Sequence, residues 1–220
     1  MSIDYRDFLP EVLAFCSDAS EPQAINAVRN ACIHVCENSL VWQVPFTLDI
    51  IAGQNQYNIA TPIDSRRSVF TRVWIQNRKI ECASADYLTA RYMQNWMTMN
   101  GVPLHYVEMQ DAGLILDQIP VETISGGMTG QIALAPTRNS TELGYEPIYE
   151  QWAEVVGFGA LARLYNTMGT SFYNKEQSER YHKMFSAGVT KITNSVNRGN
   201  GRASVIVQQR PFARGRIVWR

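Results

Sequence analysis

The chain has 220 residues, of which 45% are hydrophobic and 18% are charged, and its formal net charge at pH 7 is zero. This composition supports one ordinary hydrophobic core or two small ones. The sequence has no apolar run of about 18 residues, which excludes a helical membrane span, and its N-terminus lacks the apolar segment of a secretory signal. Four cysteines do not make a disulfide framework in a chain of this length, so we expect synthesis in a reducing cytoplasm.

The charges are sorted along the chain. Every Asp and Glu precedes Arg180, and every charged residue from Arg180 to Arg220 is basic. The zero net charge therefore hides an acidic body and a basic end. Because hydrophobic residues interrupt the basic end, we predict that it docks onto an acidic partner.

The N-terminal part has the pattern of helices. A short helix is expected over residues 10–16. A longer one begins at Ser20, which can cap the first turn together with Gln23, and Pro22 suits that turn because its missing N–H costs little there. Apolar residues at three- and four-residue spacing extend this helix to about Val41.

The pattern changes to β-strands over residues 42–136. Residues 46–51 and 57–59 flank the segment 52–55, which predicts a hairpin. Gly126 and Gly127 are expected at a flexible loop tip. Further short strands are predicted at residues 69–75, 104–107, 114–116 and 131–134, with a helix at residues 84–97 among them.

Helical patterns return at Pro147 and continue to Gly169, and a last helix is expected from about Asn174 to Gly199. Gly157 and Gly159 each cost a helix about 1 kcal/mol relative to Ala, a cost that is tolerated where two backbones approach closely. Beyond this helix the chain is expected to be extended, and residues 203–207 have the composition of a strand that pairs with a neighbour.

These elements predict an α+β fold. Residues 1–42 and 145–200 would form an α-helical bundle, residues 43–144 a β-rich insertion, and residues 201–220 an extended C-terminal arm.

One short motif raises the possibility of a metal site. On a helix Cys32 and Cys36 share a face, whereas His34 points about 200° away from Cys32. No second pair of ligands with metal-site spacing occurs elsewhere. We therefore predict no metal site and expect both cysteines to be buried in the core.

No residue pattern indicates catalysis. Glu146, Glu150 and Glu154 share a helix face, but acid–base catalysis needs two carboxylates in contrasting environments within a cleft. A solvated acidic stripe, or one that faces a basic neighbour, fits this spacing better. The chain also has no nucleophile-elbow pattern and no phosphate-binding loop, so neither an enzyme nor a cofactor is predicted.

The C-terminal arm mixes arginines with hydrophobic residues. Forked Arg–carboxylate pairs and aromatic anchors are typical of binding in a protein groove, which we favour. Contact with DNA phosphates and a disordered solubilising tail are the alternatives, and the acidic body argues against DNA. The residues expected to bind the partner are Arg210, Phe212, Arg214, Arg216, Ile217, Val218, Trp219 and Arg220.

Small and aromatic residues recur in a recognisable combination at Asp7–Val12, Ala27–Cys32, Cys36–Trp42, Gly53, Gln56–Asn58, Trp152–Leu164 and Tyr181–Phe185. Over roughly residues 8–199 the sequence resembles the bacteriophage head-to-tail adaptor proteins, also called connector or head-completion proteins.

The resemblance implies a structural virion protein without turnover. Such adaptors form a ring, usually of twelve copies, under the portal at the neck of the virion, after synthesis in the host cytoplasm. The ring extends the channel for double-stranded DNA and offers a platform to a downstream tail or nozzle protein, with no membrane involved. In this chain the portal-docking arm would be residues 203–220. Two other classes stay open: a DNA-binding head-closure factor that uses the basic tail, and a cell-wall hydrolase, for which paired carboxylates are lacking.

Overall fold

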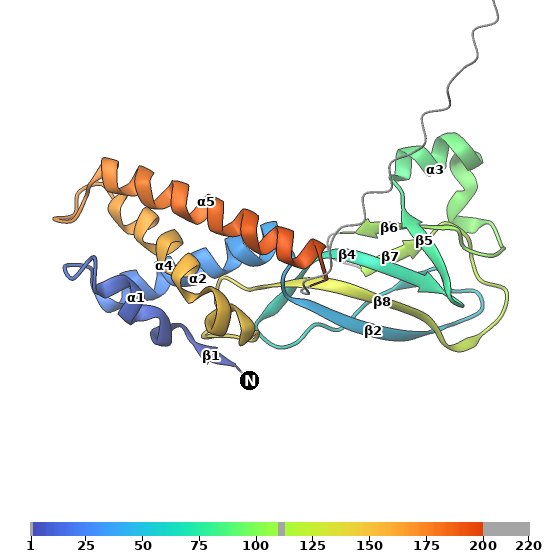
Figure 1. Ribbon diagram of the computed structural model, residues 1–220. Coiled ribbons are helices and arrows are strands. Elements are labelled where there is room, and N and C mark those ends of the chain that lie inside the picture. The colour runs from blue at the N-terminus through green and yellow to red at the C-terminus, as the bar shows by residue number, and fades with distance from the viewer. Residues whose placement is uncertain (1, 110–112, 200–220) are drawn as a thin grey trace, which may run out of the picture.

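The computed structural model describes residues 2–109 and 113–199. Four of its α-helices lie together in one half of the molecule and the large sheet fills the other half (Figure 1). The helical half contains the 3-10 helix η1 (Tyr5–Phe8), α1 (Leu9–Leu13), α2 (Glu21–Ser39), α4 (Pro147–Tyr165) and α5 (Lys175–Asn197).

Local signals fix where the helices begin and end. At the start of α2, the backbone N–H of Ser20 donates to the side chain of Gln23 over 3.2 Å, and Leu40 ends the helix in the left-handed conformation. The predicted cap of α2 is thus confirmed. The side chain of Asn174 accepts the backbone N–H of Gln177 at the start of α5, and α4 begins at Pro147 as predicted.

The interior glycines of α4 bring α5 close. A Cβ atom at Gly159 would lie 2.7 Å from the ring of Phe185, and one at Gly188 of α5 would lie 2.6 Å from the side chain of Val155. The neighbours of a Cβ atom at Gly159 are side-chain atoms, so the predicted close approach of backbones is not found there; at Gly157 such an atom would lie 3.6 Å from the backbone carbonyl oxygen of Glu11. Cys32 and Cys36 are fully buried in the core beside these helices, also as predicted.

The other half is built on a seven-stranded sheet with the order β2-β8-β4-β5-β6-β7-β3. Among the strands of the described residues, β5 and β6 form the parallel pair. The helix α3 (Ala85–Tyr92) and the 3-10 helix η2 (Met93–Thr98) cover one end of the sheet (Figure 1). The strands are β1 (Ile3–Asp4), β2 (Gln43–Ile50), β3 (Gln56–Tyr57), β4 (Ser65–Ile75), β5 (Arg78–Cys82), β6 (His105–Met109), β7 (Gly113–Leu116), β8 (Ile124–Pro136) and β9 (Glu142–Leu143).

The predicted fold class is wrong. The described residues form a mixed α/β structure with five α-helices and a large, curled seven-stranded sheet, and not a helical bundle that carries a β-rich insertion. The physical reason is the length of β8, whose 13 residues pair with β2 on one side and with β4 on the other. This central strand joins segments distant in sequence into one extensive sheet.

Two local predictions in the sheet are also wrong. Residues 46–51 and 57–59 do not form a hairpin, because β2 pairs with β8 and β3 pairs with β7. Gly126 and Gly127 lie inside β8, at a register shift opposite Asp49, and not at a loop tip. Gly126 has a φ of 60° and donates its N–H to Asp49, as expected of glycine in a β-bulge.

One hydrophobic core runs through both halves. At the junction, the ring of Trp42 stacks on Tyr145 at 6.1 Å, and the carbonyl of Trp42 accepts the N–H of Leu134 over 2.8 Å. A smaller cluster of Leu88 and Trp96 packs on Ile115 beneath α3. The helical half is therefore fastened to the sheet by buried contacts.

Candidate interaction surfaces

The arm residues predicted to bind a partner lie outside the residues that the structure describes. These are Arg210, Phe212, Arg214, Arg216, Ile217, Val218, Trp219 and Arg220.

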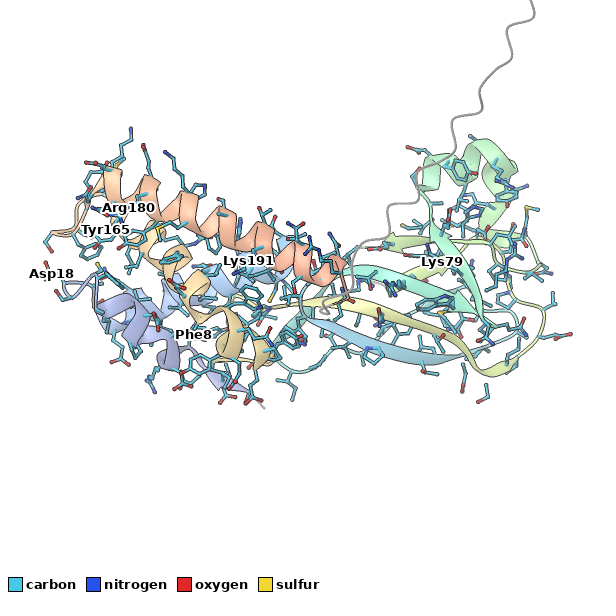
Figure 2. All side chains as sticks on the ribbon, viewed as in Figure 1. Phe8, Asp18, Lys79, Tyr165, Arg180 and Lys191 are labelled. Carbon is cyan, nitrogen blue, oxygen red and sulfur yellow. The ribbon has the colours of Figure 1, made fainter. Side chains whose placement is uncertain are left out.

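The basic residues within the described part of the C-terminal region gather on one face of α5. Arg180, Lys183, Lys191 and Arg198 are exposed and follow one another at spacings that keep them on the side opposite the buried stripe of the helix. This basic face extends for about 27 Å, at a rise of about 1.5 Å per residue. Figure 2 shows Arg180 and Lys191 along α5.

Beside this face, a cavity of about 520 Å³ opens between α2, α4 and α5. Small residues are part of its lining: Gly159 and Ala162 belong to α4, and Ser178 of α5 donates a 2.7 Å hydrogen bond to the carbonyl of Ala162. We name it the cationic pocket after Arg163 and Lys183 in its lining, which also includes the imidazoles of His34 and His182.

The pocket is an unfavourable place for further positive charge. Burial lowers the pKa of His34 most and the charge of Arg163 lowers it further, Glu37 acts in the opposite direction, and His182 has the smallest lowering effect. One carboxylate, that of Glu179, also lines the pocket, and it lies 4.0 Å from Lys175. An anion that entered would meet several hydrogen-bond donors at once.

An acidic face lies on the other side of α4. A Cβ atom at Gly157 would lie 3.2 Å from that of Glu11, so α1 packs against α4 there. Glu154 is three residues before Gly157 and shares its side of the helix, and Glu150 lies one turn earlier, before a kink at Trp152. With Asp7, four residues before Glu11, these exposed carboxylates define the acidic face: Asp7, Glu11, Glu150 and Glu154.

The two charged surfaces point away from each other. Gly157 contacts α1 and Gly159 contacts α5, and two residues correspond to a turn of about 200° around a helix. Accordingly, α1 and α5 lie on opposite sides of α4 (Figure 1). Figure 2 shows the same separation between Phe8, whose ring packs at 5.1 Å on Tyr149 of α4, and the basic residues of α5.

A buried Asp–His pair lies in the sheet half. Asp117 is fully buried and lies 3.0 Å from Nδ1 of His105. The neighbouring strand brings Glu81 opposite His105 and Cys82 opposite Tyr106, so Cys82 and His105 point to opposite faces of the sheet. Asp117 also accepts the N–H of Leu104 over 2.9 Å. Asp117 therefore links its own segment to the segment that contains Leu104 and His105.

The described residues contain no group of three or more His, Cys, Asp or Glu side chains arranged to hold a metal ion. Within residues 2–109 and 113–199, no helix combines the length and apolar character that a membrane crossing requires.

Sequence reasoning identified part of these surfaces. Of the three residues predicted as an acidic stripe, Glu150 and Glu154 are exposed, whereas Glu146, which precedes the first residue of α4, is half-buried. The basic face of α5 can be predicted from the sequence, because its basic residues recur at helical spacing. No sequence pattern predicts the cationic pocket, since His34 and Arg163 come from helices that are far apart in the sequence. Neither the models of protein families nor the curated proteins include a match to this chain.

Proposed function

We propose that this protein is a subunit of a bacteriophage head-to-tail adaptor ring. The observation that carries the proposal is the pair of unlike surfaces on the helical half, with the basic face of α5 on one side and the acidic face of α1 and α4 on the other. Identical subunits that associate through two different surfaces form a closed ring when the rotation between them closes. Opposite charges favour this contact over the pairing of like surfaces, because opposed like charges are repelled.

The division of the molecule supports separate roles for its parts. The helical half would form the ring, and the sheet half, which projects from it in Figure 1, would offer the outer or tail-facing surface. The arm of residues 203–220 would dock into the portal through Phe212 and Trp219, with arginines on acidic groups. An acidic body also suits the wall of a channel that must not hold passing DNA.

A second candidate is a head-closure factor that binds DNA. The basic face of α5 favours it, because exposed bases along one helix face suit a row of phosphates. The two candidates differ in salt dependence. Binding to duplex DNA would weaken steeply as salt rises, whereas docking through Phe212 and Trp219 would change little.

The test of the proposed function is co-sedimentation with the portal of the same virus. The full-length chain is compared with a truncation that ends at Gly201. Binding by the full-length chain alone would support both the adaptor role and docking by the arm. Equal binding by the truncation would remove the arm's role, and no binding by either chain to an assembled portal would count against the adaptor itself.

A further inference from the structure

The cations of the pocket lack partners among the described residues. Arg163 and Lys183 have no carboxylate within ion-pair distance in residues 2–109 and 113–199. The two nearby acids have other partners: Glu37 pairs with Arg66, and Glu179 pairs with Lys175. The two cations are therefore free to pair with an anion from outside the chain's own helical half.

The pocket is also shaped to admit a side chain. Its three walls come from α2, α4 and α5, and one side is the ring of Phe185, which lies 5.2 Å from the ring of His34. A carboxylate that entered would lose part of its hydration, but the guanidinium and ammonium groups replace that hydration with charge-assisted hydrogen bonds.

The acidic face of the same chain cannot supply this carboxylate. Glu11 and Glu154 lie on the side of α4 that faces α1, about 200° around the helix from the side that faces the pocket. A second copy of the chain can present its acidic face to the pocket, and its own pocket then remains free for a third copy. Repetition of this contact is heterologous, which is what a ring requires.

We propose that the cationic pocket receives the acidic face of a neighbouring copy, with Arg163 and Lys183 as the main partners of Glu11 and Glu154. This inference rests on the proposed function, because it assigns the residues of the ring contact. His34 and His182 flank the contact and add hydrogen-bond donors to it. The partner is thus a second copy of this chain, in preference to DNA.

Charge exchange between two variants tests the contact. One full-length variant carries Arg163→Glu and Lys183→Glu, and the other carries Glu11→Lys and Glu154→Lys. All four side chains are exposed, so both variants are expected to fold. The matched control is Arg78→Glu with Lys79→Glu on β5, exposed in the sheet half, where Figure 2 shows Lys79. The number of copies bound to the portal is measured by mass photometry and negative-stain microscopy.

Each interface variant alone is expected to lose about tenfold or more in ring occupancy, because like charges then oppose each other. An equimolar mixture should restore the ring, since each reversed surface meets its complement on the other variant. The control should assemble like the wild type. Zero-length carbodiimide cross-linking of the wild-type ring should join Lys183 of one copy to Glu11 or Glu154 of the next.

Three results would overturn the inference. Normal assembly by either interface variant would show that the charges are not needed. A mixture no better than its components would show that the two surfaces do not meet, and loss of duplex DNA binding by the pocket variant, without rescue in the mixture, would assign the pocket to DNA. In these cases a wild-type ring on the portal would still support the proposed function, whereas a wild-type chain that forms no ring would overturn both.

Discussion

Gly159 of α4 lies against the ring of Phe185 of α5, and a Cβ atom at position 159 would approach that ring to 2.7 Å and Ala31 Cβ to 2.9 Å. These distances are shorter than ordinary van der Waals contact. The packing of α2, α4 and α5 therefore requires a residue without a Cβ atom at position 159. The same contact leaves room for the cationic pocket, whose lining includes both Gly159 and Phe185. Packing of the helical half and the candidate ring contact are thus coupled.

Substitution of Gly159 by Ala should therefore destabilise the protein. Overpacking costs about 1–3 kcal/mol and the gain in helix propensity returns about 1 kcal/mol, so we expect a net loss of up to about 2 kcal/mol in the free energy of unfolding. Gly157→Ala is the matched control, because it has the same propensity gain while its nearest contact is 3.2 Å. Urea unfolding followed by circular dichroism measures both. Equal stability of the two variants would contradict the packing argument.

The pKa of His34 predicts a dependence of stability on pH. Because its pKa is lowered in the folded state from 6.5, the unfolded chain takes up a proton more readily than the folded chain does. Stability should therefore fall as pH decreases below about 6.5, until the lower folded-state pKa is passed. His34→Gln should lose less stability over this range than the wild type does.

His182→Gln is the control for this pH experiment. His182 is exposed on α5 and also lines the pocket, so its substitution removes a nearby imidazole without removing the partly buried one. Thermal unfolding at a series of pH values from 7.5 to about 5 gives the comparison, within the range where histidine titrates. If His34→Gln and the wild type show the same pH dependence, burial of His34 does not contribute to it.

The buried carboxylate of Asp117 should be important for the sheet half. It accepts hydrogen bonds from the N–H of Leu104 and lies 3.0 Å from Nδ1 of His105, and its side chain is fully buried. Asp117→Ala would leave the Leu104 N–H without a partner, and we expect a loss of about 3 kcal/mol in the free energy of unfolding. His105→Gln should cost less, because Gln can still donate to Asp117. Chemical unfolding of both variants checks this order, and a reversed order would contradict it.

The sequence predicted local structure better than the pairing of strands. The helices α2 and α5 have capping residues and apolar stripes that act within a few residues, so their positions followed from Ser20, Gln23 and Asn174. The pairing of β2 with β8 joins Phe46 to Gly130, and no local signal specifies a partner so distant. The glycines of β8 also have the sequence pattern of a turn. Gly130 is nevertheless required inside the strand, because a Cβ atom there would lie 2.5 Å from the carbonyl oxygen of Arg72.

Of the two candidate surfaces on α5, one follows from local sequence spacing and the other from tertiary packing. The spacing of Lys183 and Lys191 along one helix makes the basic face of α5 predictable from the sequence. The cationic pocket depends on tertiary packing, because Arg163, Lys183 and His34 line one cavity only when α2, α4 and α5 assemble. The opposite placement of Glu11 likewise follows from the contact of α1 with Gly157, which no pattern in the sequence indicates.

The last prediction concerns the aromatic residues of the arm. If Trp219 is an anchor in a portal groove, Trp219→Ala should weaken binding to the portal by about thirtyfold, which corresponds to about 2 kcal/mol for a central aromatic residue. Gln208→Ala in the same segment is the control, because a polar side chain without an anchoring role should change binding little.

Affinity is measured with the full-length chain at two salt concentrations. Trp219→Ala should lower it similarly at both, since burial of an aromatic ring depends little on screening, whereas Arg216→Ala should matter more at low salt. If Trp219→Ala instead binds as tightly as the wild type, and binding falls steeply as salt rises, the arm docks by charge alone.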